Sequence, residues 1–224
     1  MHAPRPWRFF LNSFRGYSVA PFLTLIQMLI EEHKSKTLLD YGSGAGDQYT
    51  KVVTRKKGSF RFLGRLADYW KVKVTCYDPA VPKYSSLPTA RFDAVISTDV
   101  LEHIYVDDIE WVLDEIFNKA TQFVFINVSS CSSRHTLPDG GNAHVTLRNP
   151  DWWSQQVAQT AARFPLLKYY LAVTGQGGKW ESNIFSNAPF PLRRNNVNLF
   201  PATGGWSYFL PRKIKSLFSG VLPT

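Results

Sequence analysis

Hydrophobic residues recur along the chain in two alternating patterns. Short apolar or β-branched runs predict strands, and apolar positions spaced three and four residues apart predict helices. The predicted strands span 37–40, 71–77, 92–97, 122–128 and 168–173. The predicted helices span 18–33, 47–55, 60–70, 107–119 and 149–163. Because strands separated by helices favour a parallel sheet, we expect an α/β fold: a doubly wound, mostly parallel sheet with helices on both faces.

This pattern divides the chain into three parts of one domain. Residues 1–34 form an N-terminal helical segment, residues 35–175 form the core, and residues 176–224 form an irregular basic and aromatic extension. Within the extension, only 196–200 and 206–210 predict short strands at an antiparallel edge of the sheet. A length of 224 residues suits one decorated domain better than two.

Membrane and disulfide classes are disfavoured. No segment reaches the roughly 18 uninterrupted apolar residues of a spanning helix, so no transmembrane segment is expected. The apolar stretch 17–30 follows arginines but lacks a small-residue cleavage site, and its helical spacing assigns it to the fold. The two cysteines, Cys76 and Cys131, make neither a disulfide framework nor a metal site. We therefore expect a reduced, cytoplasmic protein without a bound metal.

The junction between the first strand and the next helix carries the strongest chemical signal. The strand ends at Asp40, and Gly42, Gly44 and Gly46 follow before the helix begins at Asp47. Glycines permit positive φ and a close approach of backbone to ligand, and the carboxyl edge of a parallel sheet is where ligands bind. A dinucleotide fingerprint would need a glycine at position 47, and no Gly-Lys-Ser/Thr follows for a phosphate loop. The remaining alternative is a tight turn without a ligand.

This D-x-G-x-G-x-G pattern resembles motif I of the class I methyltransferases that depend on S-adenosyl-L-methionine (SAM). The resemblance covers roughly residues 35–175 and implies a Rossmann-like core with SAM as cofactor. It implies that the side chains and backbone that contact SAM here are those of Asp40, Gly42, Ser43, Gly44 and Gly46. Asp78, which ends the second strand, stands where the family places an acid that binds the ribose hydroxyls; an Asp-Pro turn is the alternative.

Three further segments fit the same resemblance. Residues 92–103 read FDAVISTDVLEH, similar to the family's fourth strand and the following loop. This implies that the methionine part of SAM lies beside Thr98, Asp99 and Val100. Residues 142–146 read NAHVT, as in the segment that precedes a helix in many small-molecule methyltransferases. The chain departs from the family's pattern between Asp78 and Phe92, because the family's third strand is not predicted there. In this segment the resemblance assigns Leu87 to contact with the adenine of SAM.

Methyl transfer to a hydroxyl needs a base, and imidazole is the usual choice near neutral pH. His144 is the first candidate, His103 the second and His135 the third. The Asn/Asp-Pro-Pro-Tyr/Phe sequence of amino-group methylases is absent at the end of the strand 92–97, where the chain reads Ser97-Thr98-Asp99-Val100. Cys131 lacks the Pro-Cys setting of cytosine C5 methylases. We therefore expect an O-methyltransferase that acts on a small-molecule or glycan acceptor.

The charge of the chain bears on its partners. The net charge is +9, with basic residues concentrated in 51–73 and beyond Asp151, while acids crowd 99–115. Such a field favours an anionic partner, which includes a phosphorylated acceptor. The alternative is an RNA methyltransferase or RNA-binding SAM-fold subunit that stacks bases on its aromatic residues. A SAM-fold scaffold without catalysis is the third reading.

Overall fold

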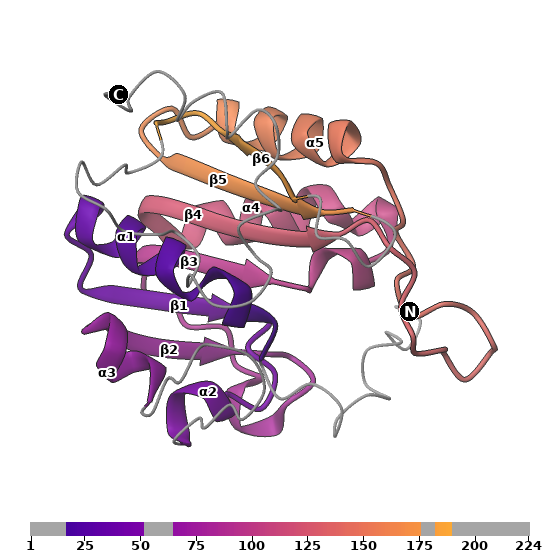
Figure 1. Ribbon diagram of the computed structural model, residues 1–224, viewed down its shortest axis with the longest axis horizontal. Helices are drawn as coiled ribbons and strands as arrows, with labels where there is room; N and C mark the ends of the chain where they lie inside the picture. Colours follow the sequence, from indigo (N-terminus) through magenta and orange to yellow (C-terminus); the bar gives the residue numbers. More distant parts are fainter. Residues whose placement is uncertain (1–16, 52–64, 176–181, 190–224) are drawn as a thin grey trace, which may run out of the picture.

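A six-stranded sheet forms the centre of the computed structural model, which describes residues 17–51, 65–175 and 182–189. The strands lie in the order β2-β1-β3-β4-β5-β6 (Figure 1). Neighbours among the first five are parallel, and β6 is antiparallel to β5, which confirms the α/β class and the mostly parallel sheet. The bounds are β1 Thr37–Tyr41, β2 Lys73–Tyr77, β3 Phe92–Thr98, β4 Ala120–Ser129, β5 Lys168–Thr174 and β6 Ser182–Ser186.

Helices connect these strands and begin where local chemistry favours it. Pro150 opens α5, and the side chain of Asn149 accepts a hydrogen bond from the N–H of Trp152 at 2.8 Å. This cap satisfies a backbone donor that the helix leaves unpaired, as the sequence predicted. The α-helices are α1 Leu23–His33, α2 Asp47–Thr50, α3 Leu66–Trp70, α4 Ile109–Lys119 and α5 Pro150–Ala162. The 3-10 helices are η2 Tyr17–Phe22, η3 Pro82–Tyr84, η4 Leu101–His103 and η5 Val106–Asp108.

The central strands are buried on both faces, because alternate residues join two separate apolar clusters. In β4, Phe123 packs in the cluster that includes Ile26 of α1. The next residue, Val124, packs in the cluster that includes Leu113 of α4 and Trp153 of α5. Burial on both faces explains why the strands read as nearly continuous apolar runs in the sequence.

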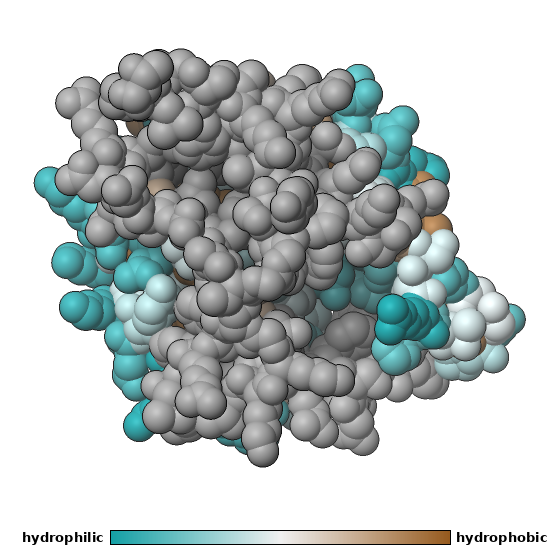
Figure 2. All heavy atoms as spheres, in the orientation of Figure 1, coloured by the Kyte–Doolittle hydropathy of each residue, from teal (hydrophilic) through white to brown (hydrophobic). Residues whose placement is uncertain are grey.

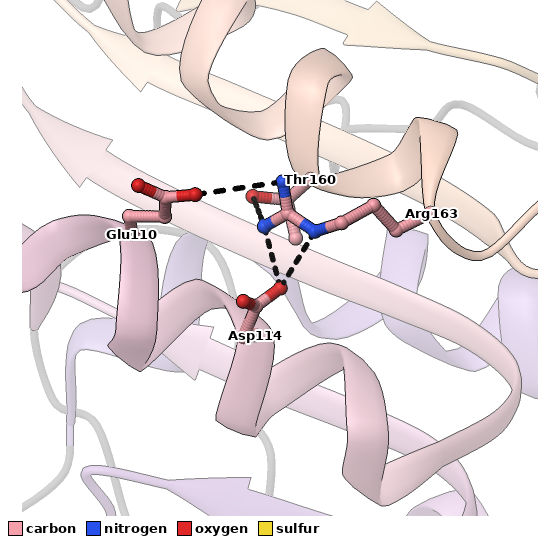
Figure 3. Close-up of polar contacts among 4 residues, drawn as sticks. All are labelled: Glu110, Asp114, Thr160 and Arg163. Carbon is pink, nitrogen blue, oxygen red and sulfur yellow. Dashed lines mark hydrogen bonds and ion pairs between the residues drawn. The ribbon is translucent and has the colours of Figure 1, made fainter.

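Ion pairs at the surface join α4 to the end of α5. The guanidinium of Arg163 lies 2.6 Å from Asp114 and 3.6 Å from Glu110, and its side chain also reaches toward Thr160 (Figure 3). The Arg163 and Asp114 side chains are 43% and 38% exposed, so the pair adds little free energy. The buried side chains between the helices supply the packing, and the ion pairs orient the helix ends.

The strand order defines the place where a ligand is expected. The chain passes from β1 to β2 on one side and then crosses to β3 on the other side of β1. The loops that follow β1 and β3 therefore leave the sheet in opposite directions. In open α/β sheets this switch point, at the carboxyl ends of the strands, is where ligands bind.

Several element predictions need correction. The helix predicted over 47–55 ends at Thr50, because Lys51 has an extended backbone with φ −106° and ψ 149°. Strand β6 was not predicted, since 182–186 has no clear alternation of apolar residues. The predicted edge strands 196–200 and 206–210 lie outside the described residues, as do 52–64 and most of the extension.

Polar residues border the described part of the face that Figure 2 shows. Figure 2 shows hydrophilic residues along both sides of the view, with hydrophobic residues in small spots. The large hydrophobic side chains that are exposed in the described ranges are Tyr105, Val106, Trp111 and Leu166. Within these ranges, no helix has both the length and the apolar composition that crossing a membrane requires.

Replacing the residue that caps α5 tests how that helix is stabilised. Asn149→Ala removes the hydrogen bond to the Trp152 N–H and is expected to lower the free energy of unfolding by about 0.5–2 kcal/mol. Urea denaturation followed by circular dichroism measures the change. The matched control is Gln155→Ala, on the exposed side of the same helix, for which a change within about 0.5 kcal/mol is expected. Equal effects of the two substitutions would contradict the capping role.

Candidate functional site

The loop 42–46, which joins β1 to α2, has a backbone that requires glycine. The φ angles of Gly42, Gly44 and Gly46 are 84°, 57° and 65°. These values lie in the left-handed region, which side chains with a Cβ disfavour. Because α2 has only four residues, it presents no substantial helix N-terminus to a ligand. The glycine backbone itself is thus the main binding feature of this junction.

Two of these glycines also meet tight packing within the chain. A Cβ at Gly42 would lie 2.3 Å from a methyl carbon of Val100, which follows β3. A Cβ at Gly46 would lie 3.1 Å from the ring of Tyr84, which follows β2. The loop 42–46 therefore contacts the segments that leave both neighbouring strands, and side chains at these two positions would separate them.

Asp78 joins the end of β2 to the loop. Its Oδ2 accepts the N–H of Gly44 at 2.8 Å, and its Oδ1 accepts the N–H of Ala80 at 2.8 Å. The first bond joins Asp78 to the glycine loop. The second closes the Asp-Pro turn, which was the alternative role for Asp78 in the sequence analysis. Each carboxylate oxygen has two acceptor positions, so each has capacity for a further bond. Burial raises the pKa of Asp78, against the opposing effect of the backbone hydrogen bonds.

Asp40 is buried beneath the loop. Its Oδ2 accepts the hydroxyl of Tyr49 at 2.9 Å and the side-chain amide of Gln48 at 3.2 Å. Burial raises the pKa of Asp40 from its ordinary value of 3.8 to about 7, although both hydrogen bonds act in the opposite direction. These contacts hold α2 against the end of β1. Direct contact of Asp40 with a cofactor stays a prediction, and the geometry gives the side chain a positioning role.

The segment 98–100 after β3 has an unusual backbone. Asp99 has φ 60°, in the left-handed region, and its N–H donates to the carbonyl of Asn127 in β4 at 3.1 Å. A non-glycine residue in this region is uncommon and marks a functional candidate. Ser18 of η2 donates its hydroxyl to the carbonyl of Thr98 at 3.1 Å. No motif marks Ser18 in the sequence, because only the packing of η2 brings it to β3.

Glu102 is a buried carboxylate that the sequence did not assign to a site. The residue has 0% relative exposure, and its Oε1 accepts the N–H of Ser129 at 2.7 Å. Fully buried glutamates are rare unless they are paired or bind a ligand. Burial, followed by the nearby Asp99 carboxylate, raises the pKa of Glu102 well above its ordinary value. The LEH wording contained this residue, but only the fold reveals its burial beside Asp99.

The two leading histidine candidates lie against each other, with ring centroids 4.7 Å apart and planes at 86°. Nδ1 of His103 lies 2.9 Å from the carbonyl of Ala143, and Nδ1 of His144 lies 2.5 Å from the carbonyl of Cys131. Because a carbonyl only accepts, each Nδ1 is protonated, and each Nε2 of the neutral ring carries the lone pair. Burial, and then His144, lower the pKa of His103. His135 lies exposed on the preceding loop.

The remaining predicted residues lie around these groups. Ser43 is buried, and its N–H donates to the carbonyl of Tyr77 at 3.1 Å, so it secures the loop. Leu87 is partly buried against the apolar cluster that includes α4. Within 79–91 the only regular element is the 3-10 helix η3 (Pro82–Tyr84), and no strand forms, as predicted. Contact of Leu87 with adenine stays a prediction.

Comparison with known proteins provides no family assignment. No protein-family model matches the chain, and no curated protein matches it. Any functional assignment therefore depends on the glycine loop, the buried carboxylates and the histidine pair at the carboxyl edge of the sheet.

The buried carboxyl of Asp40 predicts a pH dependence of stability. Its folded pKa of about 7 exceeds its ordinary value of 3.8, so the folded state keeps a proton that the unfolded state releases between these values. The contribution of Asp40 to stability is therefore present below about pH 4 and is lost as the pH rises to about 7, with a slope of up to about 1.4 kcal/mol per pH unit.

Urea denaturation between pH 4 and 8 measures this contribution as the difference between the wild type and Asp40→Asn. The variant is expected to gain stability relative to the wild type as the pH rises through this window. The control Asp107→Asn removes an exposed carboxylate, and the wild-type pH dependence should remain. Parallel curves for the wild type and Asp40→Asn would show that the carboxyl is ionised throughout.

Proposed function

We propose that the protein is a SAM-dependent methyltransferase that transfers a methyl group to an oxygen of a small-molecule or glycan acceptor. The observation that carries the proposal is the meeting of loop 42–46, Asp78 and segment 98–100 at the switch point of the sheet. These are the segments in which the sequence resembles class I methyltransferases. We also infer the doubly wound, Rossmann-like form of that fold, with helices on both faces.

The residues at this edge fit SAM. Asp78 has acceptor capacity left beside the backbone N–H groups that it already accepts, which suits a ribose hydroxyl. Asp99 offers a carboxylate for the ammonium group, and the glycines allow the backbone to approach the cofactor. When bound, SAM supplies a methyl group on a positively charged sulfur.

His144 is the base that the geometry supports best. Its Nδ1–H donates to the Cys131 carbonyl, which fixes the ring and leaves Nε2 to accept the proton of an acceptor hydroxyl. The positive charge then formed on the ring lies close to Asp99, whose carboxylate stabilises it, and to the buried Glu102. His103 packs against the ring edge-on and limits its orientation. Holding the acceptor oxygen near the methyl carbon supplies the rest of the acceleration.

The charge around His144 favours a compact acceptor over RNA. Asp99 and Glu102 lie next to the ring, and Asp107 and Asp108 follow them in η5. A phosphodiester backbone would meet the accessible carboxylates of Asp99, Asp107 and Asp108, and RNA binding depends on neutralising phosphates with cations. Many of the basic residues that suggested an anionic partner lie in 52–64 and 190–224, outside the described residues.

Calorimetry of cofactor binding tests the first half of the proposal. We expect SAM and S-adenosylhomocysteine (SAH) to bind with one site per chain, whereas NAD and ATP give no heat. Gly44→Val is expected to abolish binding, because a branched side chain at φ 57° distorts the loop and the N–H that reaches Asp78. The control Gly140→Val places the same side chain at φ 85° with nothing within 4 Å of its Cβ. Absence of SAM binding to the wild type would overturn the proposal.

Formation of SAH with fractionated cell extracts tests the acceptor class. Turnover is expected with the small-molecule or glycan fraction and is expected to survive ribonuclease treatment. His144→Ala should keep the wild-type affinity for SAM and lower turnover by about 10²–10⁴-fold. The control His135→Ala, on the exposed loop, should retain most of the turnover. Turnover that requires the RNA fraction would contradict the acceptor class and favour an RNA methyltransferase.

A further inference from the structure

Three side chains from two distant segments converge at the candidate site. Asp99 follows β3, Glu102 lies in η4, and His144 lies before α5. One potential ligand atom from each of the three lies within 4.8 Å of the other two. Ligands about 2.0–2.2 Å from a common cation lie roughly 3–4 Å from one another, so small side-chain adjustments bring these atoms to coordinating distances.

The carboxylate of Glu102 is only half satisfied by the protein. Its Oε1 accepts the Ser129 N–H, whereas its Oε2 is buried and receives no N–H or O–H from a neutral donor among the described residues; the side chain that can share a proton with Glu102 is Asp99. No lysine or arginine of the described ranges forms an ion pair with Glu102 or with Asp99. A buried carboxylate oxygen without a partner is costly, and a second carboxylate beside it increases the cost. A cation or a shared proton must offset it.

The imidazole of His144 is prepared for coordination. Nδ1 donates to the Cys131 carbonyl, and this leaves the Nε2 lone pair for a metal. Metal-binding histidines commonly donate their other ring nitrogen to a backbone carbonyl in this way, which fixes the tautomer and the ring orientation. The lone pair is therefore available without any change in protonation of the neutral ring.

Hydrogen bonds between the two segments fix the cluster before any ligand binds. The N–H of Thr146 donates to the carbonyl of Glu102 at 3.0 Å, and the hydroxyl of Thr146 donates to the carbonyl of Ile104 at 2.6 Å. His103 adds a bond to the carbonyl of Ala143 at 2.9 Å. Such support lowers the cost of organising ligands around an ion.

We propose that Asp99, Glu102 and His144 bind a divalent cation. Two carboxylates and one imidazole suit Mn²⁺ or Zn²⁺ better than Ca²⁺, because Ca²⁺ prefers oxygen ligands alone. Three protein ligands leave coordination positions open. If the protein is the methyltransferase proposed above, the cation replaces His144 as the activating group: it lowers the pKa of an acceptor hydroxyl at an open position, because an Nε2 lone pair that binds a metal cannot also accept a proton. The binding of the cation itself does not depend on that function.

Titration of Mn²⁺ followed by electron paramagnetic resonance tests the site directly. The full-length, untagged protein is treated with EDTA, dialysed and titrated in the absence of SAM. We expect one bound Mn²⁺ per chain, displaced by Zn²⁺ because divalent affinity rises from Mn²⁺ toward Zn²⁺. Mn²⁺ should also raise the thermal midpoint of the wild type, since it binds the folded state.

Glu102→Gln preserves the shape of the side chain and removes its charge. This variant is expected to bind Mn²⁺ at least 10-fold more weakly and to lose the thermal shift, while its metal-free form stays folded. Asp99→Asn should behave similarly, because asparagine tolerates the left-handed backbone at φ 60°. The matched control Asp107→Asn removes an exposed carboxylate from the same segment and should keep the wild-type affinity.

Two results would overturn the site: no binding of Mn²⁺ or Zn²⁺ by the wild type, or equal affinity in Glu102→Gln and Asp107→Asn. A proton shared between Asp99 and Glu102 would then be the partner of the buried oxygen. Calorimetry with SAM separates this outcome from failure of the proposed function. Binding of Mn²⁺ without binding of SAM would support the metal site and contradict the proposed methyltransferase function. Binding of SAM without binding of Mn²⁺ would contradict only the metal site.

Discussion

The hydrogen bond from the N–H of Gly44 to the carboxylate of Asp78 joins the loops that leave two adjacent parallel strands. The left-handed backbone of loop 42–46 points this N–H toward β2, and the packing of Gly42 against Val100 brings the segment after β3 to the same loop. Three segments of the chain are thereby held at the switch point. Together these contacts bring the residues that the sequence suggests for the cofactor to one place.

Burial affects three carboxylates at this edge, and they differ in how the protein satisfies them. Asp40 receives side-chain donors from Tyr49 and Gln48, and Asp78 receives backbone N–H groups on both oxygens. Of the three, only Glu102 keeps a buried oxygen that no N–H or O–H donor of the described residues reaches, and its neighbour there is another carboxyl, Asp99. Burial raises the pKa of all three, and such perturbed groups concentrate at functional sites. Asp40 and Asp78 stabilise the loop 42–46, whereas Glu102 has a buried oxygen to which a ligand can bind.

The sequence predicts the features that depend on local pattern. The central strands are visible because burial on both faces makes them continuous apolar runs, and α5 is visible because Asn149 and Pro150 have the cap chemistry of a helix start. The contact of Ser18 with Thr98 has no local signal, since it joins residues that only the packed sheet brings together. The sequence motif contains Glu102, but its burial beside Asp99 depends on the fold. The catalytic and cofactor roles stay predictions for the same reason. The spacing in the sequence identifies suitable residue types, whereas a role depends on which ligand each side chain contacts.

The net charge of +9 favours a negatively charged acceptor, whereas the acidic surroundings of His144 disfavour one. The chain as a whole attracts anions over long range, while Asp99 and Glu102 repel an anion that comes within a few ångströms of the ring. A divalent cation between the two carboxylates removes this conflict, because its charge cancels theirs and becomes the largest local charge. If the chain is the methyltransferase proposed above and the cation is bound, a phosphorylated acceptor that the net positive charge attracts meets an approximately neutral site. Without it, the same geometry suits only a neutral, hydroxyl-bearing acceptor, so the charge of the acceptor and the occupancy of the cluster are linked.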